Sequence, residues 1–186
     1  MDKFDAVVRD MHDSMRFVEK AKPIVLNLLK GEEIIQVEGT DNEVLKMLDQ
    51  TCGIDYYNKH EETGLVWGIA SRFQPIASGC TPWNTFTVRR TRESGVPTEY
   101  TKRKYAIEHG GEYPYLTLQA YVDEKDETVV SMAIARTKDI IESIDRRLAY
   151  VRRTRSDNHG QASFYVIDWD KLREYGYKVL VYERTT

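Results

Sequence analysis

The spacing of apolar residues changes at Gly53, and this change limits the chain to folds that combine helices with strands. Before Gly53, apolar residues such as Phe4, Val8 and Met11 recur every three or four positions, as in an amphipathic helix. After it, short runs of β-branched and aromatic residues alternate with turn sequences, which is typical of strands. We therefore expect an α/β (α+β) protein with a mixed central β-sheet flanked by helices.

The first part of the chain predicts helices. One runs from Phe4 to Val18, and a second begins at Pro23, whose fixed φ suits a first helical turn, and ends at Gly31. A third begins with the capping-box pair Thr40 and Glu43. The segment EEIIQVEG between them fits either a short strand or a helix tail.

The rest of the chain predicts one sheet and further helices. Strands are expected at Ile54 to Asn58, Leu65 to Gln74, Phe86 to Arg90, Leu116 to Val122, Val129 to Ala135, Ser163 to Ile167 and Lys178 to Tyr182. Helices are expected at Thr98 to Glu108, Lys138 to Asp145 and Asp170 to Tyr175. With 186 residues and no linker-like stretch, we expect one domain over 1–186. Its parts are a helical segment (1–31), a core (40–122) and an extension of strands and a helix (123–186).

Composition excludes several classes of protein. A hydrophobic content of 41% and a charged content of 31% do not suit a disordered chain. No run of about 18 apolar residues suggests a membrane span. The first residues carry acids rather than the apolar core of a signal peptide, so we expect a cytoplasmic protein with no membrane partner. Cys52 and Cys80 have no C-x-x-C spacing, which argues against a zinc site or a disulfide framework.

Positive charge is concentrated in two windows of an otherwise acidic chain. Residues 86–105 hold six basic and two acidic residues, and residues 144–155 hold five basic and one acidic. Such basic islands attract phosphates, although two solvated faces with local counter-charges would give the same pattern. The candidate nucleic-acid-binding residues are Arg89, Arg90, Lys102, Arg103, Arg152 and Arg153.

The segment 47–74 contains the side chains that are best suited to catalysis or metal binding. Asp49 stands at a helix end, Asp55 begins a strand, and Arg72 and Gln74 share one face of the next strand. The two carboxylates could hold Mg²⁺ or Mn²⁺, and Arg72 could bind a phosphate beside the metal. A simpler interpretation makes Asp55 a turn residue and Arg72 the partner of a carboxylate.

The sequence G-I-D, opening a strand that a hairpin follows, resembles the PD-(D/E)XK nuclease-like superfamily, in particular its phage-type members. The order helix, three strands, helix, strand from Thr40 to Val122 is also similar to the restriction-endonuclease-like core of that superfamily. In this resemblance Asp55 matches the motif aspartate, and Asp49 matches an acid that often precedes G-I-D. Glu43 or Glu33 matches a helical glutamate.

The chain departs from the family pattern on the second strand. Where an acid or Gln, one residue and then Lys are expected, the chain has Ala70, Ser71 and Arg72. Gln74 could complete the site one pleat further along, or Glu99 with Lys102 could supply it from the following helix.

Three hypotheses of function therefore follow from the sequence. The first is Mg²⁺-dependent hydrolysis of nucleic-acid phosphodiesters, with Asp55, Asp49, Arg72 and Gln74 as catalytic residues, Asp49 and Asp55 as metal ligands, and DNA favoured over RNA. The alternative is a non-enzymatic phage-type interaction or inhibitor protein that uses a nuclease-like scaffold to bind nucleic acid or a host protein. A third hypothesis is a structural subunit that forms homo-oligomers through the N-terminal helix.

Overall fold

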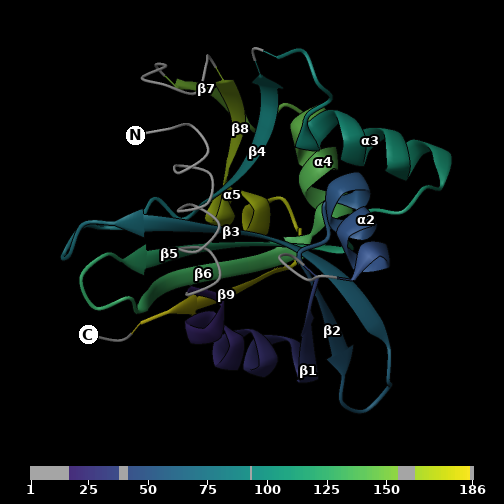
Figure 1. The fold of residues 1–186 in the computed structure, drawn as a ribbon. Helices are drawn as coiled ribbons and strands as arrows, with labels where there is room; N and C mark the ends of the chain where they lie inside the picture. Colours follow the sequence, from purple (N-terminus) through teal and green to yellow (C-terminus); the bar gives the residue numbers. More distant parts are fainter. Residues whose placement is uncertain (1–16, 38–41, 93, 155–161, 185–186) are drawn as a thin grey trace, which may run out of the picture.

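Two β-sheets organise the protein (Figure 1). The computed structural model describes residues 17–37, 42–92, 94–154 and 162–184. The larger sheet has six strands in the order β1-β2-β3-β5-β6-β9, and its neighbouring strands are antiparallel except for the parallel pair β3 and β5. Its strands are β1 (Gly31–Gln36), β2 (Tyr56–His60), β3 (Val66–Ile76), β5 (Leu116–Asp123), β6 (Val129–Arg136) and β9 (Val179–Glu183). The expected α/β class and mixed central sheet are confirmed.

A second, three-stranded antiparallel sheet corrects the expectation of one sheet. It contains β4 (Thr85–Arg92), β8 (Ala162–Asp168) and β7 (Tyr150–Thr154), in the order β4-β8-β7. In Figure 1 it rises from the larger sheet beside α3 (Glu99–His109) and α4 (Thr137–Asp145). The third strand expected in the core therefore pairs with β8, far along the chain, and not with β3. Local apolar spacing carries no information on such a distant pairing.

Helices cover both faces of the larger sheet. A helix over residues 17–29 lies on one face, where its buried side chains Phe17, Ala21 and Val25 join Leu118 and Met132 of the strands in one apolar cluster (Figure 1). The opposite face has a second cluster, in which α4 and α5 (Trp169–Glu174) pack with β4, β8 and the other side of β5 and β6. Side chains alternate across β5, so this one strand supplies both clusters.

The predicted start of a helix at Pro23 is wrong. Residues 17–29 form a continuous helix that contains Pro23 in its interior. An interior proline lacks an N–H group for the i−4 carbonyl and destabilises a helix. Buried Phe17, Val18, Val25 and Leu29 on both sides of the proline pack against the sheet, and this packing holds the helix together.

The next helix, α2 (Glu43–Cys52), begins later than the capping-box pattern predicted. Its N-cap is Asn42, whose side chain accepts hydrogen bonds from the backbone N–H groups of Val44 and Leu45. Asn caps helices as well as Thr does, so Thr40 is not needed at the cap. Gly53 ends α2 with a φ of 68°, a left-handed conformation that suits glycine.

The structure also bears on the expected order of the elements and on the segment after Gly31. The order α2-β2-β3-β4-α3-β5 matches the expected helix, three strands, helix, strand. The ambiguous segment after Gly31 is the strand β1, so Glu33 is not a helical glutamate. Most of the helix predicted from Phe4 to Val18, and its suggested role in oligomers, lies outside the described residues. Among the helices of the described part, none is both long enough and apolar enough to cross a membrane.

Candidate functional site

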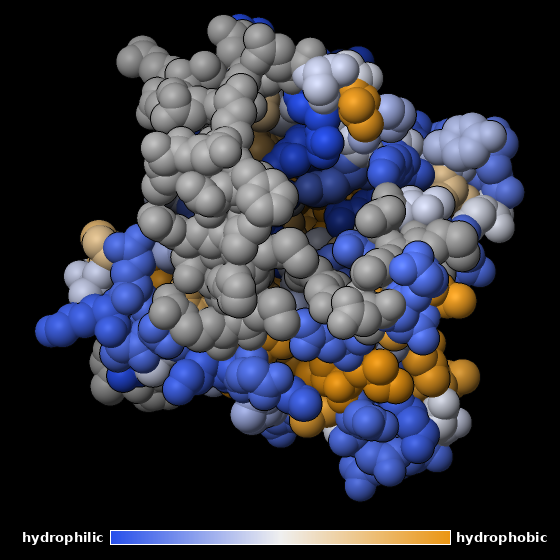
Figure 2. All heavy atoms as spheres, viewed as in Figure 1, coloured by the Kyte–Doolittle hydropathy of each residue, from blue (hydrophilic) through white to orange (hydrophobic). Residues whose placement is uncertain are grey.

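Charged side chains from two strands, one helix and the segment before β2 meet on the face of the larger sheet that is turned toward β4. The carboxylate–arginine cluster consists of Asp55, which immediately precedes β2, Arg72 of β3, Arg89 of β4, and Glu99 and Arg103 of α3. Glu99 and Arg103 are four positions apart, so both project from one side of the helix. Figure 2 shows a hollow with strongly hydrophilic walls in the region where Figure 1 places β4, α2 and α3.

Asp55 reaches across to the neighbouring strand. One of its carboxylate oxygens, Oδ2, accepts hydrogen bonds from the backbone N–H and the hydroxyl group of Ser71. The local fold positions it, because Gly53 ends α2, Ile54 is 2% exposed in the core, and the N–H of Asp55 donates to the carbonyl of Ile69. Its carboxylate therefore bonds to β3, and these bonds differ from those of a turn residue that bonds its own segment.

Arg72 and Glu99 form an ion pair within the cluster. The Arg72 Nη2 atom lies 2.7 Å from Glu99 Oε1, and both side chains are about one quarter exposed, at 28% and 26%. Glu99 Oε2 accepts a further hydrogen bond from the backbone N–H of Arg89. Both carboxylate oxygens of Glu99 are thus engaged by arginine donors.

These contacts change the acidity of Glu99. Burial acts to raise its pKa, but the charges of Arg72 and Arg103 and the hydrogen bond from Arg89 outweigh burial and lower the pKa from 4.5 to about 2. Arg103 is 8% exposed, and burial lowers the pKa of its guanidinium group while Glu99 and Asp55 raise it. The cluster therefore combines three arginine side chains with two acidic side chains.

The cluster has more hydrogen-bond donors than acceptors. Arg72 donates to the hydroxyl group of Thr87, which in turn donates to Oε1 of the buried Gln119. This direction leaves the Gln119 Nε2 group facing away from Thr87, and that nitrogen has no partner among the described residues. The buried Nε of Arg89 also has no partner there. Both nitrogens are buried, so each is an unpaired donor inside the protein.

A groove extends from Arg72 between the two sheets. It has a volume of about 310 Å³. Its described lining is Arg72, Phe73, Gln74, Pro75, Thr87, Arg152, Phe164 and Val166, none of which is acidic. The Arg72 and Arg89 guanidinium carbons lie 5.3 Å and 5.6 Å from the centroid of the Phe164 ring. Arg152 is opposite Phe164 in the pairing of β7 with β8.

The predicted basic residues separate into three places. Arg89 and Arg152 lie on the face of the small sheet that lines the groove, because they pair with Phe164. Arg90 and Arg153 alternate with them and lie on the other face, where Arg90 donates to Tyr165. On α3, Lys102 is exposed and Arg103 is buried. Gln74 lines the groove one pleat beyond Arg72, as expected.

The two predicted metal ligands have different surroundings. Burial raises the pKa of Asp49, and the nearby Lys102 opposes this. Asp55 lies near Arg103 and bonds to Ser71. Among the described residues, no three Asp, Glu, His or Cys side chains form a group that could hold a metal ion. A divalent cation at Asp55 or Glu99 would compete with donors already in place, so the arrangement suits an anion better than Mg²⁺.

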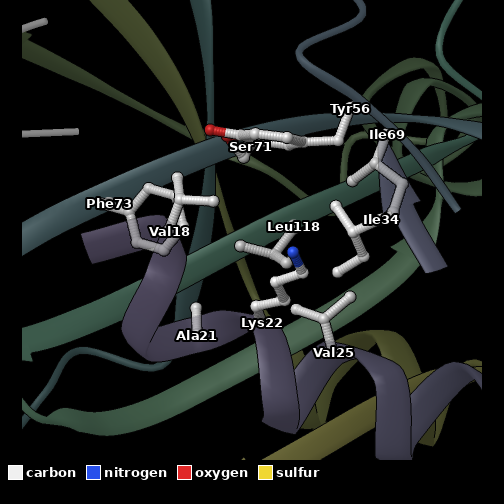
Figure 3. Close-up of a pocket in the computed structure, with 10 residues that line it drawn as sticks. All are labelled: Val18, Ala21, Lys22, Val25, Ile34, Tyr56, Ile69, Ser71, Phe73 and Leu118. Carbon is white, nitrogen blue, oxygen red and sulfur yellow. The ribbon is translucent and has the colours of Figure 1, made fainter. Parts of the chain in front are cut away.

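Two other hollows lie on the opposite side of the larger sheet from the cluster. A cavity of about 20 Å³ between the helix 17–29 and β3 is lined by apolar side chains and by Lys22 and Ser71 (Figure 3). It has room for about one water molecule. A hollow of about 730 Å³ is lined by Trp67 and Tyr115, whose rings stack 6.1 Å apart, and by Lys30, Arg136 and Lys178. It contains none of the predicted site residues.

The sequence did not reveal the direct pairing of Glu99 with Arg72 or the parts played by Thr87, Gln119 and Phe164. The spacing of Glu99 and Arg103 on one helix was the available signal, since it places an acid and a base on the same side.

Comparison with family models, with curated proteins and with solved structures finds no match for this chain.

Proposed function

We propose that this protein binds nucleic acid and holds the phosphates of a strand in the groove between β3 and the small sheet. One observation carries the proposal: arginines from three different strands gather at Phe164 and the groove. The guanidinium groups of Arg72 and Arg89 lie over the Phe164 ring, and Arg152, opposite Phe164 in the pairing of β7 with β8, lines the groove with Arg72. The described lining of this groove contains no acidic residue. Guanidinium groups bind phosphate oxygens strongly, so this group of arginines supports an anionic ligand.

The experiment is a binding titration at several salt concentrations, with a fluorescent DNA oligonucleotide followed by anisotropy and an RNA of the same sequence in parallel. If three arginines each neutralise one phosphate of a single strand, log Kd should change with log salt with a slope of about 2 in magnitude. Absence of binding at low salt to either nucleic acid would overturn the proposal. DNA is proposed as the preferred ligand.

A second candidate is hydrolysis of the bound phosphodiester with Mg²⁺ or Mn²⁺. It is favoured by one observation: two carboxylates, Asp55 and Glu99, both lie near Arg103. Arg72 would have to leave Glu99 before that carboxylate could bind a cation. Cleavage of single-stranded, duplex or branched DNA that requires metal and is lost in Asp55→Ala would support hydrolysis, and intact substrates would exclude it.

The proposed relation to the PD-(D/E)XK superfamily rests on the element order from α2 to β5 and on Asp55 preceding β2 with Arg72 on β3. The placement of β4 in the small sheet is a difference from the expected core.

We also propose a cytoplasmic location, which cell fractionation tests. Binding of a host protein instead of nucleic acid would appear as a failed DNA titration together with a stable protein complex.

A further inference from the structure

We infer that the strand in the groove is single-stranded and that its unpaired bases stack on Trp83 and Tyr150. This inference rests on the proposed nucleic-acid binding and adds the form of the ligand. It starts from the aromatic side chains beside the groove, which the phosphate contacts alone do not explain.

Trp83 is an exposed but fixed ring. It precedes β4, and 52% of its surface is exposed. The guanidinium carbon of Arg152 lies 4.6 Å from its ring centroid, and the ring of buried Tyr121 meets it edge to face at 6.4 Å. The Tyr121 hydroxyl is itself tied to Thr85 by hydrogen bonds. A ring held in this way can receive a base without first losing much side-chain freedom.

Tyr150 extends the same surface. It lies two positions before Arg152 on β7, so both side chains share one face of the strand. It pairs with Val166, which lines the groove, and it is 58% exposed. Arg152 therefore has the Trp83 ring beside its guanidinium group and Tyr150 two positions before it on the same face of β7. Alternation of a cation with aromatic rings is the arrangement that binds single strands, since the cation contacts phosphates and the rings stack on bases.

The need for accessible base faces indicates that the bound nucleic acid is single-stranded. In a duplex the faces of the bases are buried in the stack, so a protein ring can stack on them only after they leave it. Phe164 faces the guanidinium groups of Arg72 and Arg89, and Arg152 covers part of Trp83. Incoming bases can stack on the surface that Trp83 and Tyr150 leave exposed. A volume of about 310 Å³ is also the size of a pocket for a small ligand rather than for a double helix.

The test compares a labelled oligo-dT with a hairpin duplex of equal length, using the full chain and anisotropy at fixed low salt. Trp83→Ala should weaken binding of the single strand by about 5- to 100-fold and leave duplex affinity unchanged, whereas Trp83→Phe should keep most of the affinity. Tyr115→Ala is the matched control, because Tyr115 is an exposed aromatic residue, at 43%, that lines the other hollow. Circular dichroism confirms that each variant is folded.

The outcomes separate the two proposals. The protein could bind the single strand and the duplex with equal affinity, and Trp83→Ala could leave both affinities unchanged. This result would overturn stacking, while the proposed binding of nucleic acid would stand. If Tyr115→Ala, and not Trp83→Ala, weakened binding of the single strand, the binding site would be the hollow lined by Tyr115, and the inference would be overturned. Absence of binding to either ligand would overturn both proposals.

Discussion

The guanidinium group of Arg72 and the carboxylate of Glu99 are 27 positions apart in the chain and lie 2.7 Å apart in the fold. The pair connects β3, which borders the groove, to the helix α3. Because Arg72 also donates to Thr87 and faces Phe164, one side chain joins the acidic part of the cluster to the proposed binding surface. Changes in this pair should therefore affect both stability and binding.

Replacement of Glu99 should change how stability depends on pH. A carboxylate with a folded-state pKa of about 2 and a reference value of 4.5 stabilises the fold above pH 4.5, and this stabilisation is lost as pH falls toward 2. Urea unfolding should show wild type losing about 2 kcal/mol through this group by pH 3. Glu99→Gln should be less stable than wild type at pH 7, with the difference shrinking in acid.

Glu108→Gln provides the control for this measurement. Glu108 lies on the same helix, and its side chain is 54% exposed. This variant should follow the wild-type pH profile within experimental error. A difference between Glu99→Gln and wild type that stays constant from pH 7 to pH 3 would contradict the account of the ion pair.

Removal of the Asp55 carboxylate should destabilise the fold. Asp55→Ala leaves the backbone N–H and the hydroxyl group of Ser71 without this acceptor, at a cost of about 1–3 kcal/mol in the free energy of unfolding. It also removes a counter-charge from buried Arg103. Asp55→Asn keeps an acceptor oxygen and should lose less stability in chemical denaturation. Equal stability of wild type and both variants would show that the contact with Ser71 contributes nothing.

Replacement of Pro23 should stabilise the protein. Alanine at this exposed position restores the N–H group that an interior helical residue donates to the i−4 carbonyl, so Pro23→Ala should raise the free energy of unfolding by about 1–3 kcal/mol. Lys20→Ala, at another exposed position of the helix, should have little effect. A lower melting temperature for Pro23→Ala would mean that the proline is required for the local helix geometry.

Local patterns in the sequence were sufficient for most of the larger sheet. The strands at Ile54 to Asn58 and Leu65 to Gln74 were expected close to β2 and β3, because their apolar alternation and the turn between them are local signals. The placement of Arg72 and Gln74 on one face followed from strand alternation alone. These signals come from neighbouring residues, so no knowledge of distant contacts was needed.

The small sheet and the carboxylate–arginine cluster depend on contacts between residues far apart in the chain, which local sequence patterns do not predict. The strand β7 was missed because the sequence YVRRT carries two arginines and its residues Tyr150 to Arg153 are all exposed, so no apolar alternation marks it. The pairing of β4 with β8 joins residues 70 or more positions apart in the chain. The meeting of Glu99 with Arg72 depends on how α3 docks, which local spacing does not specify.

Adjacent arginines on β7 test the proposed binding surface most directly. Arg152 lies on the groove face and Arg153 on the opposite face, so the two variants Arg152→Gln and Arg153→Gln remove the same charge from neighbouring positions. We expect Arg152→Gln to weaken binding of labelled single-stranded DNA and to reduce the salt slope by about 0.7, while Arg153→Gln leaves both near the wild-type values. Equal effects of the two variants would contradict a groove that holds the phosphates.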